Sequence, residues 1–371
     1  MNPSRLLLRL DVAIAAAIDS HSSHCLRAER ACYLARRGQF DEAKATLVEL
    51  RQTYARSPNV EVSAWLSLAE GLLIHFSNMG ELARDKIHRA YALSSAADLT
   101  QMKALSAAWL ANMDYLLGDM AGMARYVEQA LELALKTNHS TLSRANLVVA
   151  HAYHLSGRLD LAKPWYARAH EHATAEGDDA TIGALMHNMA WLRAANLRQE
   201  TLCGTASSPN GEHALVSVES TLQFDSLFGA TSLDASAQVL RAQILAVKGR
   251  FEEALMAYEE YLLPAIQQGM SGMHANLLSD KAWCRLNLGQ SQAAYVDAKT
   301  AESLVNSGDL FDDRASTHSR LAQVFAAFGD SDSATRHDDL AKEAWKGHER
   351  LQRYAVELLD GMADSGRLVA K

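Results

Sequence analysis

The stretch SRANLVVAHAYHLSGRLDLAKPWYARA, residues 143–169, decides the fold of this 371-residue chain. Its first half is an apolar segment that predicts a helix, and this helix is expected to end near Gly157. Glycine suits the C-terminal end of a helix because it has no Cβ to oppose a left-handed backbone. A second helix is expected to begin at Asp160 and to run through Tyr166 and Ala169. The carboxylate of Asp160 interacts favourably with the positive, N-terminal end of the helix dipole. The stretch therefore predicts two helices joined by a tight turn.

The same unit recurs along the chain and is marked by small residues at near-constant spacing. Eight of them follow one another at intervals of 40, 40, 39, 40, 52, 40 and 40 residues, each in an apolar stretch: Ala31, Gly71, Ala111, Ala150, Ala190, Ala242, Ala282 and Ala322. Side chains of this size are needed where two helices cross closely, because larger ones push the axes beyond the usual ~8–10 Å. The register of small residues therefore predicts a stack of helical hairpins.

The composition supports an all-α fold. Apolar residues make up 49% of the chain, which is enough for a continuous core, and only 5 prolines are present to interrupt helices. Few alternating runs of valine and isoleucine occur, so no sheet is expected. A chain of this length need not divide into separate domains, because each repeat of a helical stack contacts only its neighbours.

The charge balance and the cysteine content limit the possible functions. The formal net charge of −8 argues against a nucleic-acid surface, which needs clustered lysine and arginine. No apolar span of about 18 residues exists, so no membrane crossing is expected. The 4 cysteines show no disulfide framework. We therefore expect a cytoplasmic chain that binds neither nucleic acid nor membrane, and the sequence leaves its oligomeric state open.

The turn between the paired helices resembles that of a known repeat family. Gly38, Phe40 and Ala43 form the motif Gly-x-Phe-x-x-Ala, which recurs at 249–254. Together with the small residues at the helix crossings, this motif resembles the tetratricopeptide repeat (TPR) over residues 24–345. The resemblance implies a right-handed superhelical solenoid of about eight hairpins. The repeats of about 40 residues are longer than the usual 34. They resemble those of the sensor domain of the maltose-regulon activator and of quorum-sensing peptide receptors.

The register also predicts how the chain is organised. An N-terminal secretory signal is disfavoured because Arg9 and Asp11 interrupt the apolar run. The interval of 52 residues indicates an insertion of loop composition, either a tolerated surface loop or a flap or break between subdomains of five and three repeats. The expected segments are an N-terminal capping helix (1–23), then repeats 1 to 4 with the first part of repeat 5 (24–200), and the insertion (201–212). The rest of repeat 5 with repeats 6 to 8 (213–341) follows, and then a C-terminal capping helix and tail (342–371).

No arrangement of residues predicts catalysis. The chain has no Gly-x-Ser-x-Gly, no phosphate-binding loop, no His-Glu-x-x-His and no Cys-x-x-Cys. His21, His24, Cys25 and Cys32 are clustered, but ordinary packing of the N-terminal helices is favoured there over a metal site. We therefore expect a protein that is not an enzyme and that has no metal and no cofactor.

The candidate binding surface is the first helix of each repeat, because these helices line the concave face in the family that the chain resembles. Counting from the small residues places amides, imidazoles, aromatics and one guanidinium there: Asn112, Tyr115, Arg144, His151, His154, His187, Trp191, Gln243, Asn276, Trp283 and Asn287. Trp65 falls on the same face in the second repeat. Amides pair with an extended peptide backbone, and aromatic side chains are rigid anchors. Packing between repeats is the alternative for each residue taken alone.

These residues predict a non-catalytic TPR adaptor or sensor that binds a peptide or protein partner in its concave groove, in signalling or regulation. The alternative is a sensory segment that binds a small molecule or peptide and controls a separate DNA-binding or nucleotide-cyclising domain. Arg144 is the one basic residue placed centrally on the face, so capture of an acidic C-terminus is not favoured. The residues do not identify the partner.

Overall fold

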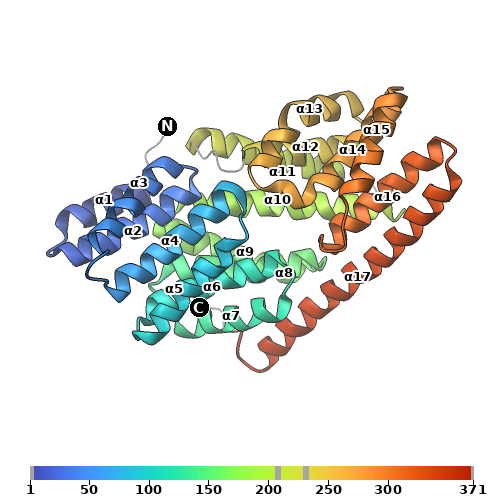
Figure 1. The fold of residues 1–371 in the computed structure, drawn as a ribbon. Helices are drawn as coiled ribbons and strands as arrows, with labels where there is room; N and C mark the ends of the chain where they lie inside the picture. Colours follow the sequence, from blue (N-terminus) through green and yellow to red (C-terminus); the bar gives the residue numbers. More distant parts are fainter. Residues whose placement is uncertain (1–3, 205–209, 229–233, 369–371) are drawn as a thin grey trace. The chain divides into compact units, whose positions relative to one another are not determined.

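The computed structural model describes residues 4–204, 210–228 and 234–368, and this part of the chain is helical without any strand. Figure 1 shows the helices in chain order. They are α1 (Arg5–Ala16), α2 (Ser20–Arg36), α3 (Phe40–Thr53), α4 (Val60–Asn78), α5 (Leu82–Ala96), α6 (Thr100–Leu116), α7 (Met120–Leu133), α8 (His139–Leu155), α9 (Leu159–Glu176), α10 (Asp179–Leu202), α11 (Asn210–Phe228), α12 (Asp234–Val247), α13 (Phe251–Gln267), the 3₁₀ turn η1 (Met270–Met273), α14 (His274–Asn287), α15 (Ser291–Leu304), α16 (Phe311–Ala327) and α17 (Ser331–Asp364).

Consecutive helices pair as hairpins, and the first helix of each hairpin packs against the first helix of the next. The pairs α2–α3, α4–α5, α6–α7 and α8–α9 form one such series, in which α2, α4, α6 and α8 lie against one another in that order. The pairs α12–α13 and α14–α15 continue the pattern, and α16 packs on α14. The prediction of an all-α fold built from helical hairpins is therefore confirmed.

The small residues lie where the register places them. Ala31, Ala111, Ala150, Ala190, Ala242 and Ala282 are at most 1% exposed. At Gly71 of α4 a Cβ would lie 2.6 Å from Cγ1 of Ile87 and 2.9 Å from the carbonyl oxygen of Ala83, both in α5. Even alanine is too large for this crossing, so glycine is required. Ala322 of α16 is only half-buried.

The turns follow the motif that the sequence shows. Gly157 ends the α8 hairpin turn with φ of +72°, and Gly249 does the same after α12 with φ of +73°. Asn138 begins α8 by accepting a hydrogen bond from the backbone N–H of Thr141 at 3.2 Å. An amide side chain at this position satisfies a backbone donor that the helix itself leaves unpaired.

The chain divides into two compact units, each described here by itself. Unit 1 comprises residues 1–185, 224–232 and 354–371, and unit 2 comprises 186–223 and 233–353. The loop insertion expected at 201–212 overlaps the last two residues of α10 and the first three of α11, and residues 205–209 of it lie outside the described part of the chain.

Within unit 1, α1 contacts both the first hairpin and the connection that follows α9. Leu6 and Leu10 of α1 pack with Tyr33 of α2. The backbone N–H of Leu6 donates to the carbonyl oxygen of Gly177 at 3.2 Å, and Arg9 pairs with Glu176. The helix expected as an N-terminal cap therefore also touches residues that lie four hairpins further along the chain.

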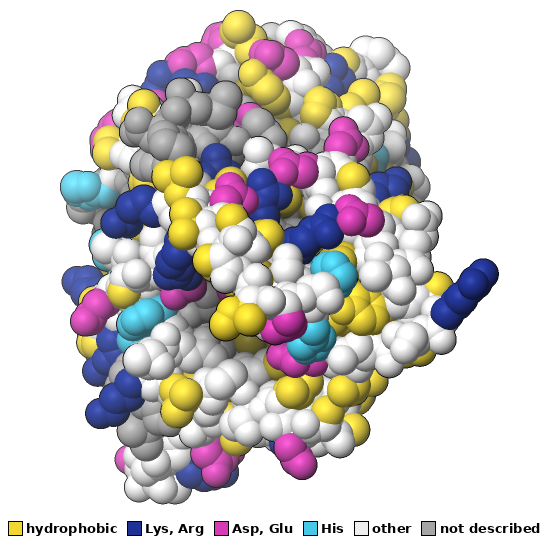
Figure 2. Space-filling view, turned by 90° about the vertical axis from the view of Figure 1, so that its left-hand side faces the viewer, with side chains coloured by type: hydrophobic (Ala, Val, Ile, Leu, Met, Phe, Trp, Pro, Cys, Tyr) yellow, Lys and Arg dark blue, Asp and Glu magenta, His cyan; other side chains and the backbone are white. Residues whose placement is uncertain are grey.

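The surface carries charges of both signs. Figure 2 shows acidic and basic side chains interspersed on the face that it draws. Among the described helices, none combines the length and the apolar character needed to cross a membrane.

Candidate ligand-binding site in unit 1

The first helices of the hairpins in unit 1 surround a cavity of about 40 Å³, here called the inner cavity. Its wall is formed by side chains of α2, α4, α6 and α8, completed by α1 and by the start of α10. Tyr33, Trp65 and Trp109 are its aromatic residues, and Leu6 and Leu10 of α1 close one side. A space of this size holds about three water molecules or a group of similar volume.

Arg144 of α8 is the unusual residue of this wall. Its side chain is 4% exposed, and its guanidinium carbon lies 3.9 Å from the centre of the Trp109 ring. Within the described part of the chain this guanidinium has no acceptor: Nε is buried without a hydrogen-bond partner, and no carboxylate forms an ion pair with it. A buried charge without a counter-charge is costly.

The surroundings of Arg144 are reflected in its pKa. Burial, with added repulsion from Arg36, lowers the pKa of Arg144 to about 9, and the attraction of Asp178 only partly opposes this. The guanidinium is therefore still charged at neutral pH, but burial destabilises its charged form. An anion placed beside it would remove this penalty.

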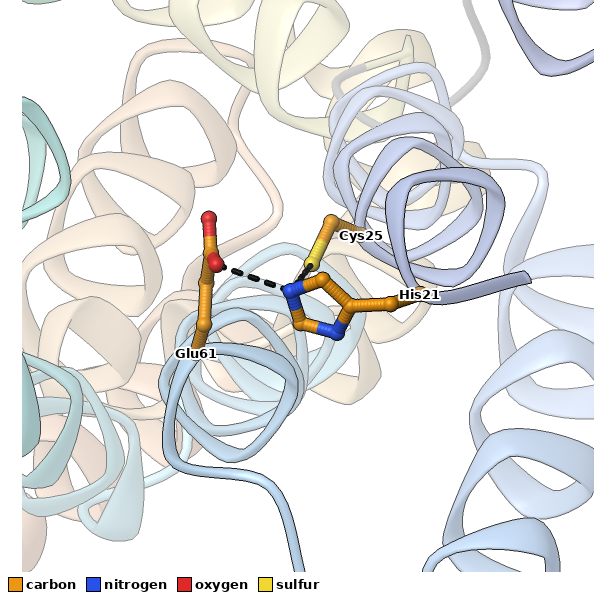
Figure 3. Close-up of side chains that lie close together, drawn as sticks. All are labelled: His21, Cys25 and Glu61. Atoms are coloured by element: carbon orange, nitrogen blue, oxygen red, sulfur yellow. Dashed lines mark hydrogen bonds and ion pairs between the residues drawn. The ribbon is translucent and has the colours of Figure 1, made fainter. Parts of the chain in front are cut away.

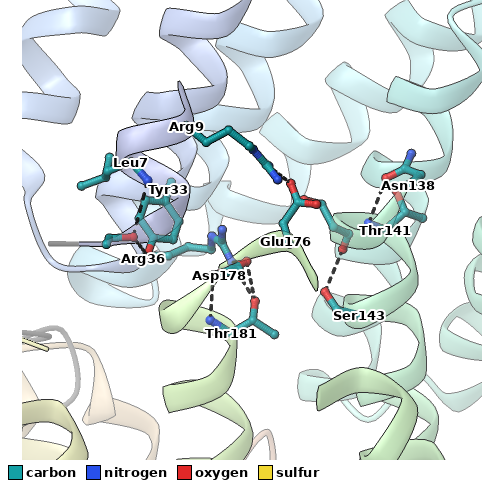
Figure 4. Close-up of polar contacts among 12 residues, drawn as sticks. Leu7, Arg9, Tyr33, Arg36, Asn138, Thr141, Ser143, Glu176, Asp178 and Thr181 are labelled. Atoms are coloured by element: carbon teal, nitrogen blue, oxygen red, sulfur yellow. Dashed lines mark hydrogen bonds and ion pairs between the residues drawn. The ribbon is translucent and has the colours of Figure 1, made fainter. Parts of the chain in front are cut away.

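Arg36 of α2 lies near Arg144 in the same wall but is already neutralised. Its Nη1 is 2.6 Å from Oδ2 of Asp178 and 2.8 Å from Oγ1 of Thr181 (Figure 4). Asp178 is 1% exposed and also accepts a hydrogen bond from the backbone N–H of Thr181 at 2.9 Å, at the start of α10. The contacts of Arg36 join it to residues 142 and 145 positions further along the chain. They draw α2 towards the start of α10 and close the ring of helices around the inner cavity.

Glu29 is the other acidic residue of the wall described here. Burial, followed by repulsion from Glu176, raises the pKa of Glu29 to about 7, while Arg9 and Arg36 oppose this. The carboxyl is thus about half protonated at neutral pH and supplies only part of a negative charge. The inner cavity consequently has an excess of positive charge centred on Arg144.

The other residues that the sequence predicts in unit 1 lie together, but not in this wall. Asn112, His151 and His154 are 6%, 3% and 2% exposed, and Tyr115 is half-buried. The rings of Tyr115 and His151 are 5.7 Å apart, and Nδ1 of His154 is 3.0 Å from the hydroxyl of Tyr166 in α9. Burial, followed by repulsion from Arg144, lowers the pKa of His151 to about 3. The structure therefore places these side chains between helices and not on an open wall.

The residues predicted in unit 2 are divided between buried and more accessible positions. His187, Gln243 and Asn276 are 7%, 2% and 1% exposed. Trp191, whose ring is 6.2 Å from that of His187, is half-buried. Trp283 is also half-buried, and the exposed Asn287 donates to its carbonyl oxygen at 2.8 Å.

Asn276 belongs to a buried polar network that sequence reasoning missed. It accepts from Nη2 of Arg198 at 2.6 Å and donates to Oδ1 of Asp313 at 2.5 Å. Asp280 forms ion pairs with Arg198 and Arg320, each with a nitrogen-to-oxygen distance of 2.8 Å. A signal for part of this network is present in the sequence, because Asp280 and Arg320 are 40 residues apart and so occupy the same position of consecutive repeats.

The inner cavity itself contains functional candidates that the sequence did not single out. Tyr33 and Arg36 lie in α2, the first helix of the first hairpin, and Asp178 lies just before α10, but the count along the first helices did not select them. The contact between Arg36 and Asp178 has no counterpart in the repeat spacing. Trp65 of α4 lies on the predicted face and does line the cavity, together with Arg144. Of the residues predicted as the site, Arg144 is the one that the structure places in this wall.

Comparisons with known proteins bear on the fold. No protein-family model matches the chain, and a search of curated proteins gave no match. Among solved structures, the "Crystal Structure of Rap Protein Complexed with Competence and Sporulation Factor" is similar with a TM-score of 0.52 and 14% sequence identity, covering 88% of this chain and 99% of that chain. The "Crystal Structure of the Apo Form of RapI" has a TM-score of 0.47 and 11% identity, covering 93% and 98%. The chain thus has a fold similar to that of the Rap protein, and the expected resemblance to long-repeat peptide receptors is confirmed at the level of the fold.

Proposed function

We propose that this chain is a non-catalytic adaptor or sensor that binds a peptide or protein segment in unit 1, and that Arg144 receives a carboxylate of that ligand in the inner cavity. The observation that carries the proposal is the guanidinium of Arg144, 4% exposed and without an acceptor among the described residues. The likeness of fold to a Rap protein solved with competence and sporulation factor supports a peptide as the ligand.

The chemistry of the wall favours a carboxylate. Guanidinium groups bind carboxylates through two parallel hydrogen bonds, and such charge-assisted bonds are about twice as strong as neutral ones. Trp109 stacks on the flat face of Arg144, which leaves the N–H groups at its edge to bind the ligand. The cavity of about 40 Å³ has room for a carboxylate but not for a peptide chain. We therefore expect one acidic side chain or a C-terminus to enter it.

The proposal differs from the expectation drawn from sequence at one point. One basic residue on the face does not by itself favour an acidic ligand, because surface arginines are ordinarily solvated or paired. The burial of Arg144 without an acceptor changes this assessment, since a buried cation gains more from a counter-ion than an exposed one does. Signalling or regulation remains the expected setting.

The proposal can be tested by selecting peptides on the protein. A display library of random peptides with free C-termini is passed over the purified chain, over Arg144→Met, and over the control Arg125→Met. Arg125 is exposed on α7, the second helix of its hairpin, so its loss should not affect the inner cavity. We expect the wild-type chain and Arg125→Met to enrich peptides that carry an acidic residue or depend on the free C-terminus.

For Arg144→Met we expect this enrichment to disappear, because methionine keeps the apolar stem of the side chain and removes its charge. Circular dichroism of the three proteins verifies that they are equally folded. Equal enrichment of the same acidic peptides by wild type and Arg144→Met would show that Arg144 is not the receptor for the carboxylate. No enrichment by the wild-type chain would contradict peptide binding as a whole.

A further inference from the structure

Three potential metal ligands meet at the start of the first two hairpins. His21 and Cys25 lie one turn apart near the N-terminus of α2, and Glu61 lies in the first turn of α4. Nε2 of His21 is 2.9 Å from Oε2 of Glu61 and 3.9 Å from Sγ of Cys25 (Figure 3). One ligand atom from each residue lies within 4.8 Å of the other two.

This arrangement follows from the packing of α2 on α4. Residues four apart on a helix lie on the same face, so His21 and Cys25 point in the same direction. α4 packs against α2, and the first turn of α4 brings Glu61 to that face. The other members of the sequence cluster are separate: His24 bonds to the hydroxyl of Tyr54 at 3.0 Å, and Cys32 lines the inner cavity.

We propose that His21, Cys25 and Glu61 bind a Zn²⁺ ion that links α2 to α4. An imidazole nitrogen, a thiolate and a carboxylate are the donor types that zinc takes in proteins, usually in tetrahedral geometry. At the usual bond lengths, neighbouring donors around tetrahedral zinc are about 3.3–3.8 Å apart. The separations of 2.9 and 3.9 Å lie within about 0.4 Å of this range, and the third, which is at most 4.8 Å, reaches it with a rotamer shift of about 1 Å or less.

Access to the site is open for both the ion and a fourth ligand. The side chains of His21 and Glu61 are 38% and 40% exposed, whereas Cys25 is 9% exposed beneath them. Three protein ligands leave one tetrahedral position, which a water molecule fills. A metal ion held by both helices would add a cross-link between the first two hairpins of the stack, α2–α3 and α4–α5, which already pack against each other.

The thiol of Cys25 must lose its proton to bind the ion. Burial, followed by the charges of Glu61 and Asp19, raises the pKa of Cys25 to about 12, so the group is a neutral thiol in the absence of a cation. When Zn²⁺ binds, the S–H proton leaves to the solvent and the sulfur lone pair forms the Zn–S bond. The positive charge of the ion compensates for the burial of the thiolate.

The test uses Co²⁺ as a spectroscopic substitute for Zn²⁺ on the purified full chain after dialysis against a chelator. We expect one equivalent of Co²⁺ to give tetrahedral d–d bands and a thiolate-to-cobalt charge-transfer band, both removed by an added equivalent of Zn²⁺. Cys25→Ser should abolish the charge-transfer band. The control Cys203→Ser, which changes an exposed cysteine elsewhere, should leave it intact.

His21→Ala and Glu61→Gln should each weaken Co²⁺ binding at least tenfold, since each removes one ligand. Circular dichroism of the metal-free proteins checks that all variants fold, so a loss of binding is not a loss of structure. Absence of the charge-transfer band in wild type, or a band that survives Cys25→Ser, would overturn the proposal. So would equal Co²⁺ affinity in wild type, His21→Ala and Glu61→Gln.

Discussion

Buried histidines should make the stability of the protein depend on pH. His151 is 3% exposed, and its pKa is lowered to about 3, mainly by burial. An unfolded histidine has a pKa of about 6.5. Below that pH the unfolded chain binds a proton that the folded chain does not. The contribution of the neutral, buried His151 to the free energy of unfolding is therefore complete above pH 6.5 and is lost as the pH falls towards the folded pKa. The loss is about 1.4 kcal/mol per pH unit.

His151→Gln should therefore flatten the fall of the free energy of unfolding between about pH 6.5 and pH 4, measured by urea denaturation. The matched control is His88→Gln, which changes an exposed histidine on α5 and should keep the wild-type slope. If His151→Gln and wild type lose stability in parallel over this range, His151 is protonated in the folded protein, and water reaches its ring more readily than its buried contacts indicate.

At the scale of single residues, the sequence predicted packing better than chemistry. The size of Ala150 and Gly71 is fixed by a local rule, the close crossing of two helices that are neighbours in the chain. The role of Arg144 depends on what surrounds its guanidinium, namely Trp109 of α6, Arg36 of α2 and Asp178 before α10. A count along one helix cannot predict that environment, because all three of these residues come from other elements.

At the scale of elements, α1 forms one side of the inner cavity. Leu10 is 3% exposed against α2 and the cavity, whereas Val12 is 69% exposed. Because Leu6 and Leu10 close one side of the cavity, we expect α1 to move when the carboxylate of a ligand enters it. Leu10→Asp should release α1 because it removes the apolar contact with Tyr33 and requires a carboxylate to be buried in its place.

Hydrogen exchange followed by mass spectrometry measures this release. Amides of α1 should exchange faster in Leu10→Asp than in wild type, while those of α4 should be unchanged. The control Val12→Asp adds the same charge on the exposed side of α1 and should leave the exchange as it is. Equal protection of α1 in Leu10→Asp and wild type would mean that α1 is not the movable wall of the inner cavity.

The helices and their hairpins follow closely from the sequence, but the long-range contacts that close the helices around the inner cavity do not. The hairpin turns at Gly157 and Gly249 have the positive φ that the motif requires, because the turn is made by residues that are adjacent in the chain. The contact of Arg36 with Asp178 spans 142 residues and has no counterpart in the repeat period. The contact of Leu6 with Gly177 is equally remote. The sequence therefore predicts the hairpins, whereas the inner cavity depends on contacts that only the folded chain reveals.

At the scale of the whole molecule, the proposed function is that of a helical-repeat protein that would bind an acidic peptide segment through the first helices of its hairpins. In unit 1 a ligand in the inner cavity would touch α2, α4, α6 and α8 together. Binding would thus be shared among four consecutive repeats, and each repeat would contribute two to four of the side chains that line the cavity. The second helices α3, α5, α7 and α9 would contribute none.

Site-specific photo-crosslinking tests this central claim most directly. The photoreactive residue p-benzoylphenylalanine replaces Trp65 of α4 in one protein and Arg125 of α7 in another, and each is irradiated with an acidic peptide recovered by selection on wild type. Trp65 lines the inner cavity, and Arg125 is exposed on a second helix. We predict a covalent peptide adduct at position 65 and none at position 125. An adduct at position 125 with none at position 65 would contradict the account, because it would place the ligand on the second helices.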